Sequence, residues 1–153
     1  MNLVVIFGVT GAVIAAVLAG IGSARAMGMA GEAAAGVITE DPRKFGQTLV
    51  LQAIGSTNGI YGLLIGFLIL TKTMALPPEM ATTENGIVLL LSGIPVGVVG
   101  YLAAIIQGRV LVSGIILVGK RDGELAKPMI YAAMIETFAV FALLISFLIY
   151  NSI

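Results

Sequence analysis

The sequence predicts an all-α membrane protein whose four transmembrane helices form two tandem hairpins. Of its 153 residues, 59% are hydrophobic and only 10% are charged, which separates it from ordinary soluble proteins. Three runs, residues 1–24, 45–71 and 85–108, carry no charge, and each exceeds the roughly 20 residues that a helix needs to cross the hydrocarbon core. None of these runs shows the period-2 alternation of transmembrane β-strands, so a barrel is excluded.

The four helices follow one another with short polar connections. We expect the first helix at about residues 3–38 and the second at about 46–75, with a charged turn between them. The third is expected at about 86–120 and the fourth at about 126–151, where Glu136 is the one charge after Pro128. These bounds place a first hairpin at residues 1–75 and a second at residues 86–153. A cleaved secretory signal is the rival interpretation of the first helix, but no basic residue precedes the apolar run.

Basic residues are distributed unevenly among the three connections. Lys72 alone lies by the second connection, whereas seven others lie in or near the first and third: Arg25, Arg43, Lys44, Arg109, Lys120, Arg121 and Lys127. By the positive-inside rule, the first and third turns are cytoplasmic and both termini are outside. The sequence therefore predicts a multi-pass membrane protein with cytoplasmic hairpin turns, and we expect its location to be the plasma membrane.

The two hairpins resemble copies of one unit. Residues 63–70 and 143–150 match at six of eight positions with an offset of 80, and Thr57 matches Thr137 at the same offset. This pattern favours a parallel tandem repeat. Small residues also recur every four positions on the first and third helices: Ala12, Ala16, Gly20, Ala24, Gly28, and Gly100, Ala104, Gly108. Such residues let helices approach closely, either inside one four-helix bundle or on the inside of an oligomeric ring.

Glu136 is the strongest candidate for a functional residue. Its twelve-residue separation from Glu124 corresponds to about 18 Å of helix, which is near the middle of the bilayer. A carboxylate at that depth is costly unless it is protonated, paired or bound to a cation. A permanently neutral acid that makes a packing hydrogen bond is the structural alternative. We predict an ion site at Glu136.

Other oxygen-bearing residues reach the same depth. Counting from the expected cytoplasmic turns places Gln107, Thr57 and Asn58 level with Glu136, and Ile54, Thr57, Asn58 and Tyr61 share one helix face. The carboxylate, two amide oxygens, the Thr57 hydroxyl and a freed carbonyl at Ile54 suit a hard cation. We favour Na⁺. H⁺ stays an alternative, because a proton carrier needs only the carboxyl group and one hydrogen-bond partner.

Composition excludes several other functions. The chain has no Cys and no His, which excludes disulfides, zinc sites, haem ligation by His, and the Ser-His and Cys-His catalytic pairs. No nucleophile–base pair remains, so no catalytic residue is assigned. Eight basic residues balance eight acidic ones, and nucleic acid is excluded as a partner. From another class of protein, a small oligomeric ion carrier or channel could also use one buried glutamate.

Several motifs together resemble the proteolipid (K or c) subunit of V-type rotary ATPases over nearly the whole chain. The resemblance is carried by Gly20-Ile21-Gly22-Ser23-Ala24-Arg25, Gly31-Glu32-Ala33-Ala34-Ala35, Gln107-Gly108-Arg109, and Tyr131-Ala132-Ala133-Met134-Ile135-Glu136-Thr137. It implies a rotor ring of identical subunits in the lipid bilayer, turned against a stator membrane subunit that supplies an arginine. It also implies central-stalk subunits that couple the ring to a soluble head handling ATP, with no ATP site in this chain.

The resemblance also implies roles for individual residues. In sodium-translocating members of that family, ion ligands match the Ile54 carbonyl and the side chains of Thr57, Asn58, Gln107 and Glu136, and a tyrosine matching Tyr61 hydrogen-bonds the glutamate. This chain departs from the sodium pattern twice. It has Asn58 where the pattern has Gln, and Gly55-Ser56 where the pattern has Pro-Gly. Ser56 occupies the first-hairpin position equivalent to Glu136, so one carrier site is expected per four helices.

Overall fold

The computed structural model describes residues 3–153, and within that range it consists of helices and short connections without a strand. The helices are α1 (Leu3–Glu40), α2 (Phe45–Ile54), α3 (Thr57–Ala75), α4 (Thr83–Lys120) and α5 (Ala126–Tyr150), with 3₁₀ turns at Pro42–Lys44 (η1) and Pro78–Met80 (η2). Four segments are long and apolar enough to cross a membrane: Leu3–Glu40, Pro42–Ala75, Thr83–Lys120 and Ala126–Tyr150. The predicted fold class is confirmed.

The helix bounds differ from the sequence-based ones by more than two residues in two places. The helix expected at residues 46–75 is two helices, because the chain leaves the helical path between Ile54 and Thr57. The helix expected from residue 86 begins at Thr83, where the Thr82 side chain accepts a hydrogen bond from the Asn85 amide and caps the first turn. The division of the chain into units at residues 1–75 and 86–153 stays a prediction.

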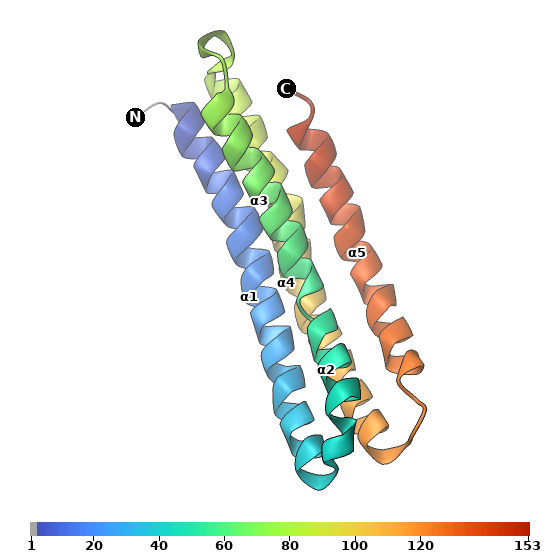
Figure 1. Cartoon of the computed structure of the whole chain (residues 1–153). Coiled ribbons are helices and arrows are strands. Elements are labelled where there is room, and N and C mark those ends of the chain that lie inside the picture. The colour runs from blue at the N-terminus through green and yellow to red at the C-terminus, as the bar shows by residue number, and fades with distance from the viewer. Residues whose placement is uncertain (1–2) are drawn as a thin grey trace.

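The helices run side by side along one axis (Figure 1). Both described ends of the chain and the α3–α4 connection lie at one end of the bundle, and the α1–α2 and α4–α5 connections lie at the other. α1 and α4 form the most extensive helix pair, α3 packs on α1, and α5 packs on α4. α3 and α5 contact each other far less. The core is therefore built around α1 and α4.

Glycines allow the backbones of α1, α3 and α4 to approach closely. A Cβ on Gly93 would lie 2.0 Å from the carbonyl oxygen of Gly11, and one on Gly62 would lie 2.3 Å from that of Ala15. Both distances are far below van der Waals contact, so any side chain at these positions would force the helices apart. This close packing is typical of helix pairs in lipid, where small residues let backbones meet.

The predicted stripe of small residues on the first helix coincides with this packing only in part. Ala12 is buried, but Ala24 is exposed and a Cβ on Gly28 would meet nothing within 4 Å. Residues four apart advance about 400° around a helix, so a four-residue stripe drifts by about 40° at each step. Ala12 and Ala16 lie against Gly66 of α3, and over sixteen residues the stripe turns away from α3 and faces outward from the single chain.

The buried apolar side chains form two clusters. One contains Val4, Ala12, Ala15, Ile65, Ile69, Leu89 and Val96, and the other contains Ala30, Ala34, Leu51, Leu111, Ile115, Val118 and Ala132. Along α3 and α4, the buried polar residues Asn58 and Gln107 fall between the members of the two clusters. The core thus has a polar layer between two apolar halves.

Candidate ion site

The polar layer begins at the break between α2 and α3. Gly55 N–H donates to the Gln52 carbonyl and Ser56 N–H donates to the Ala53 carbonyl, each at 3.1 Å. These are the tighter bonds of a 3₁₀ turn, which end α2. The Thr57 hydroxyl donates to the Ile54 carbonyl at 3.0 Å. The chain therefore breaks its helix with Gly-Ser and no proline, and the break brings the oxygens of Ile54 and Thr57 together.

Two buried amides lie in the same layer. Asn58 and Gln107 are both 0% exposed. Asn58 Nδ2 donates to Gln107 Oε1 at 2.9 Å, and Gln107 Nε2 donates to the carbonyl of Ala132 on α5 at 3.1 Å. This relay fixes both amides and joins α3, α4 and α5.

The relay leaves one buried oxygen without a partner. Within residues 3–153, Asn58 Oδ1 is shielded from solvent and accepts no hydrogen bond. An orphaned buried acceptor costs about 1–3 kcal/mol relative to a satisfied one, so native proteins seldom keep such an atom without a reason. A cation or a donor placed beside Asn58 would remove that cost.

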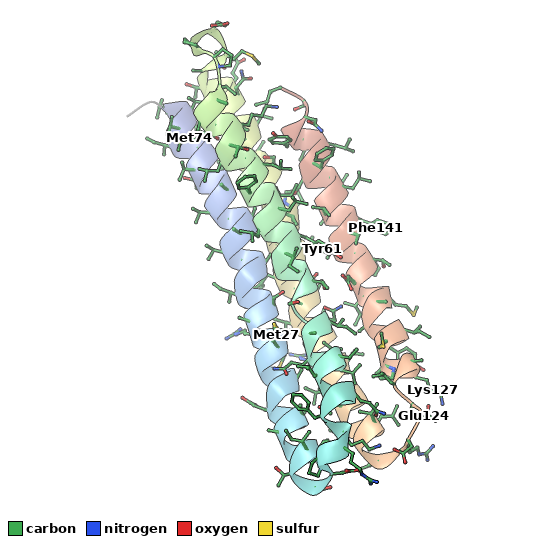
Figure 2. All side chains as sticks on the ribbon, in the orientation of Figure 1. Met27, Tyr61, Met74, Glu124, Lys127 and Phe141 are labelled. Carbon is green, nitrogen blue, oxygen red and sulfur yellow. The ribbon has the colours of Figure 1, made fainter. Side chains whose placement is uncertain are left out.

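Glu136 lies on α5 and faces α3. The Tyr61 hydroxyl donates to Glu136 Oε1 at 2.5 Å, and Figure 2 shows Tyr61 about halfway along the bundle, on the side of α3 nearest α5. The carboxylate is partly exposed and lies in an open cavity of about 270 Å³ with Ala133, Thr137, Val140 and Phe141. The single chain thus leaves the glutamate open on one side.

The six predicted site residues form three bonded pairs. Thr57 bonds Ile54, Asn58 bonds Gln107, and Tyr61 bonds Glu136. Between residues 3 and 153 no side-chain hydrogen bond joins one pair to another. The pairs are nevertheless neighbours, because Ala132, which Gln107 bonds, precedes Glu136 by one helical turn. The structure brings the predicted residues to one level without closing them around a common point.

Sequence reasoning missed the residue that connects the break to α1. The Gly59 amide, in the first turn of α3, donates to the Ser23 hydroxyl at 2.7 Å. Ser23 lies in the Gly20–Arg25 motif, where the only signal is a hydroxyl among glycines and alanines. A second missed serine, Ser146 on α5, accepts from the amide of Val96 at 3.1 Å beside Pro95 of α4.

Comparison with known proteins gives two consistent results. The model of the ATP synthase C-subunit family matches this chain twice, at residues 10–69 and 90–149. The chain is 40% identical over 144 residues to the V-type sodium ATPase subunit K of Enterococcus hirae, a match that covers 94% of this chain and 90% of that protein. It is 35% identical over 144 residues to the A-type ATP synthase subunit K of Methanocaldococcus jannaschii, covering 94% of this chain and 61% of that protein. The two family matches are separated by the same 80 residues as the repeat in the sequence.

Proposed function

The chain belongs to the ATP synthase C-subunit family and is a rotor proteolipid of the V/A type, and on that premise we propose that it carries Na⁺ across the plasma membrane on Glu136. Ion movement is coupled by rotation of a ring of identical subunits to ATP hydrolysis in a soluble head. In this proposal the chain contributes no catalytic residue and no ATP site. Both termini lie outside, and the α1–α2 and α4–α5 turns are cytoplasmic.

One observation carries the choice of ion: a single carboxylate, Glu136, lies one helical turn from Ala132, whose carbonyl the Asn58–Gln107 relay reaches, and that relay holds a buried amide oxygen without a partner. No group of three or more His, Cys, Asp or Glu side chains within residues 3–153 could hold a metal, so the charge at the site does not suit a divalent ion. One negative charge with neutral oxygens suits a monovalent hard cation. The Enterococcus hirae relative is named as a sodium ATPase subunit, which supports Na⁺ as the cargo.

The proposed ligands come from four helices. α2 and α3 supply the Ile54 carbonyl, the Thr57 hydroxyl and Asn58 Oδ1, α4 supplies Gln107 Oε1, and α5 supplies Glu136. Tyr61 orients the carboxylate through its hydrogen bond. The amide relay supports this set, because Asn58 uses its nitrogen on Gln107 and so keeps its oxygen free.

Charge neutralisation explains how such a site would transport ions. An ionised Glu136 is costly against hydrocarbon, whereas Na⁺ cancels its charge and lets the site pass through lipid. A stator membrane subunit supplies an arginine that pairs with Glu136 and displaces the ion, and central-stalk subunits transmit the rotation. Arg109 is a poor substitute, because it is exposed and two residues from the buried Gln107, hence about 200° around the helix.

The spacing of carboxylates favours pumping over synthesis. Ser56 stands in the first hairpin where the second has Glu136, so each chain of four helices carries one ion. Fewer carboxylates around the ring lower the number of ions moved per ATP, and each ATP then drives ions against a steeper gradient. Ring stoichiometry and the direction of ATP-driven flux in vesicles would test this.

The test of the cargo is carbodiimide labelling of purified rings. A carbodiimide reacts with a protonated, unoccupied carboxyl, so Na⁺ should protect Glu136 at neutral pH. Glu136→Gln should abolish both labelling and transport. Glu32→Gln, at an exposed glutamate of α1, is the matched control and should leave both unchanged.

H⁺ is the second candidate, and the shorter amide favours it. The sodium pattern has Gln where this chain has Asn58, so one oxygen reaches less far toward the ion. Labelling of Glu136 that responds to pH but is the same across a wide range of Na⁺ would identify H⁺ as the cargo. Normal ion transport by Glu136→Gln would contradict both versions.

A further inference from the structure

The first turn of α3 lacks an ordinary cap. The first amides of a helix have no carbonyl partner within it, and the side chain at the N-cap commonly accepts a hydrogen bond from the third helical residue. In α3 the N-cap is Ser56, but its hydroxyl donates backward to the Ala53 carbonyl at 2.7 Å. The amide of Gly59, the third residue of α3, therefore needs an acceptor from elsewhere.

Ser23 of α1 supplies that acceptor. Its hydroxyl oxygen lies 2.7 Å from the Gly59 nitrogen, and its side chain is only 5% exposed. Glycine at position 59 favours the contact, because a Cβ there would lie 3.1 Å from both the Cβ and the Oγ of Ser23 and would push Ser23 away by a few tenths of an ångström. Ser23 thus acts as a cap provided by a neighbouring helix.

We propose that Ser23 is a positioning residue for ion binding, which holds the α2–α3 break in the form that exposes the Ile54 carbonyl and the Thr57 hydroxyl. The inference rests on the proposed Na⁺ site. Without the Ser23 hydroxyl, the Gly59 amide regains a partner only if the chain straightens and it donates to the carbonyl of Gly55 in a regular helix. A continuous helix moves Ile54, Thr57 and Asn58 away from their present arrangement.

The location of Ser23 separates this role from that of a ligand. Ser23 uses its oxygen on the Gly59 amide, and it belongs to α1, which contributes no proposed ligand. Its removal should therefore change the affinity of the site for Na⁺ while the carboxylate and the ligand oxygens remain in the chain. A residue that only fills space in the core would lower the stability of the protein without a selective effect on ion binding.

The experiment compares two buried serines in assembled rings. Ser23→Ala should raise the Na⁺ concentration that half-protects Glu136 from carbodiimide by roughly tenfold, as expected for one lost hydrogen bond that orders ligands. Ser92→Ala is the matched control, because Ser92 is also buried and its hydroxyl donates to Leu89 of its own helix at 2.7 Å. This control should match the wild type, and both variants should keep detergent-resistant rings.

Gly59→Ala approaches the same contact from α3. It should raise the half-protecting Na⁺ concentration as well, and the Ser23→Ala/Gly59→Ala double variant should show little further change, because both substitutions remove one interaction. Wild-type half-protection in Ser23→Ala rings, or an equal shift in Ser92→Ala rings, would overturn the positioning role alone. If neither Ser23→Ala nor Gly59→Ala formed rings, the positioning role would also be overturned, in favour of a role of this contact in folding. Absence of Na⁺ protection in wild-type rings would instead refute the proposed cargo, together with this inference.

Discussion

Asn58 shows how a single side chain can prepare a site for an ion. It is completely buried, its nitrogen is committed to Gln107, and its oxygen has no partner within residues 3–153. If Asn58 were only a packing residue, an apolar side chain of similar size would avoid the cost of the orphaned oxygen. Its retention is explained if that oxygen binds the cargo.

Replacement of Asn58 by Leu tests this role. Asn58→Leu keeps the branched shape of the side chain but removes the free oxygen and the N–H that donates to Gln107, so the half-protecting Na⁺ concentration in carbodiimide labelling should rise at least about tenfold. Labelling without Na⁺ should persist, because Glu136 and Tyr61 are unchanged. Gln52→Met is the control, since it replaces another side-chain amide of the same segment, one that is partly buried and makes one bond, to the Met27 carbonyl at 3.3 Å. Equal shifts in the two variants would argue against Asn58 as a ligand.

For the individual residues, the sequence predicted which side chains lie at the same depth in the membrane, but not which atoms form hydrogen bonds with one another. The depth of Glu136 follows from counting residues along the helix, and the shared face of Thr57, Asn58 and Tyr61 follows from helical periodicity. The Ser23–Gly59 bond depends on how α1 and α3 are rotated relative to each other, and a hydroxyl among glycines and alanines does not reveal that. Whether the Asn58 oxygen is free likewise depends on which acceptor the Asn58 nitrogen binds in the folded chain, and the sequence does not reveal that.

Among the helices, the second predicted one differs most from its hydropathy pattern, because it breaks into α2 and α3. The run from residue 45 to 71 is uncharged, so hydropathy alone predicts one helix through it. Glycine disfavours a helix interior by about 1 kcal/mol relative to alanine, and the Ser56 hydroxyl competes for a backbone carbonyl. Together they end α2 at Ile54 without a proline.

A substitution at the break should restore the helix at the expense of the site. Gly55→Ala adds helix propensity where the chain must leave the helix, and its Cβ would lie 3.2–3.3 Å from Gln52 O, Ala26 Cβ and Met27 Cγ. We expect a several-fold rise in half-protecting Na⁺, of roughly the size of a 1 kcal/mol propensity change. Gly46→Ala, whose Cβ would meet nothing within 4 Å, should have no effect. An unchanged Gly55→Ala ring would show that the break does not depend on this glycine.

An ion pair between the α1–α2 and α4–α5 turns gives the fold a pH dependence. Lys44, only 7% exposed, donates to the carboxylate of Asp122. The hydrogen bond and charge of Lys44 hold the pKa of Asp122 below its ordinary value of 3.8. A lowered pKa in the folded state stabilises the protein above about pH 4, and this contribution is lost as the pH falls through the folded-state pKa.

Asp122→Asn should therefore lower the thermal unfolding temperature of detergent-solubilised protein at pH 7 and have no effect at pH values below the folded-state pKa. The decrease should be small, at most about 2 °C, because the Asp122 side chain is largely exposed. Glu79→Gln serves as the control. Glu79 lies in the exposed η2 turn, away from the Lys44–Asp122 pair, so this variant should unfold at the wild-type temperature. A difference between Asp122→Asn and wild type that is the same at neutral pH and at a pH below the folded-state pKa would contradict the linkage.

For the whole molecule, the fold class follows from physical limits that the sequence displays directly. A helix satisfies its own backbone hydrogen bonds inside lipid, so long uncharged runs predict helices and their number, and the structure confirms four membrane-length segments. The resemblance to rotary-ATPase proteolipids is confirmed by the family matches. The packing of α1 on α4 was not predictable residue by residue, because several faces of α1 carry glycine or alanine.

Replacing a small residue by leucine should have different effects at the α1–α4 contact and on the outward face of α1. Gly93→Leu places a side chain against the Gly11 carbonyl, where even a Cβ would lie at 2.0 Å, so the α1–α4 pair and the single chain should fail to fold. Ala24 is exposed in the single chain, and in the proposed ring such outward small residues lie against a neighbouring protomer. Ala24→Leu should therefore leave a helical, membrane-inserted chain but abolish detergent-resistant oligomers on gels. Full-sized rings from Ala24→Leu would show that this face does not pack against the next protomer, since a leucine is too large for a close helix contact.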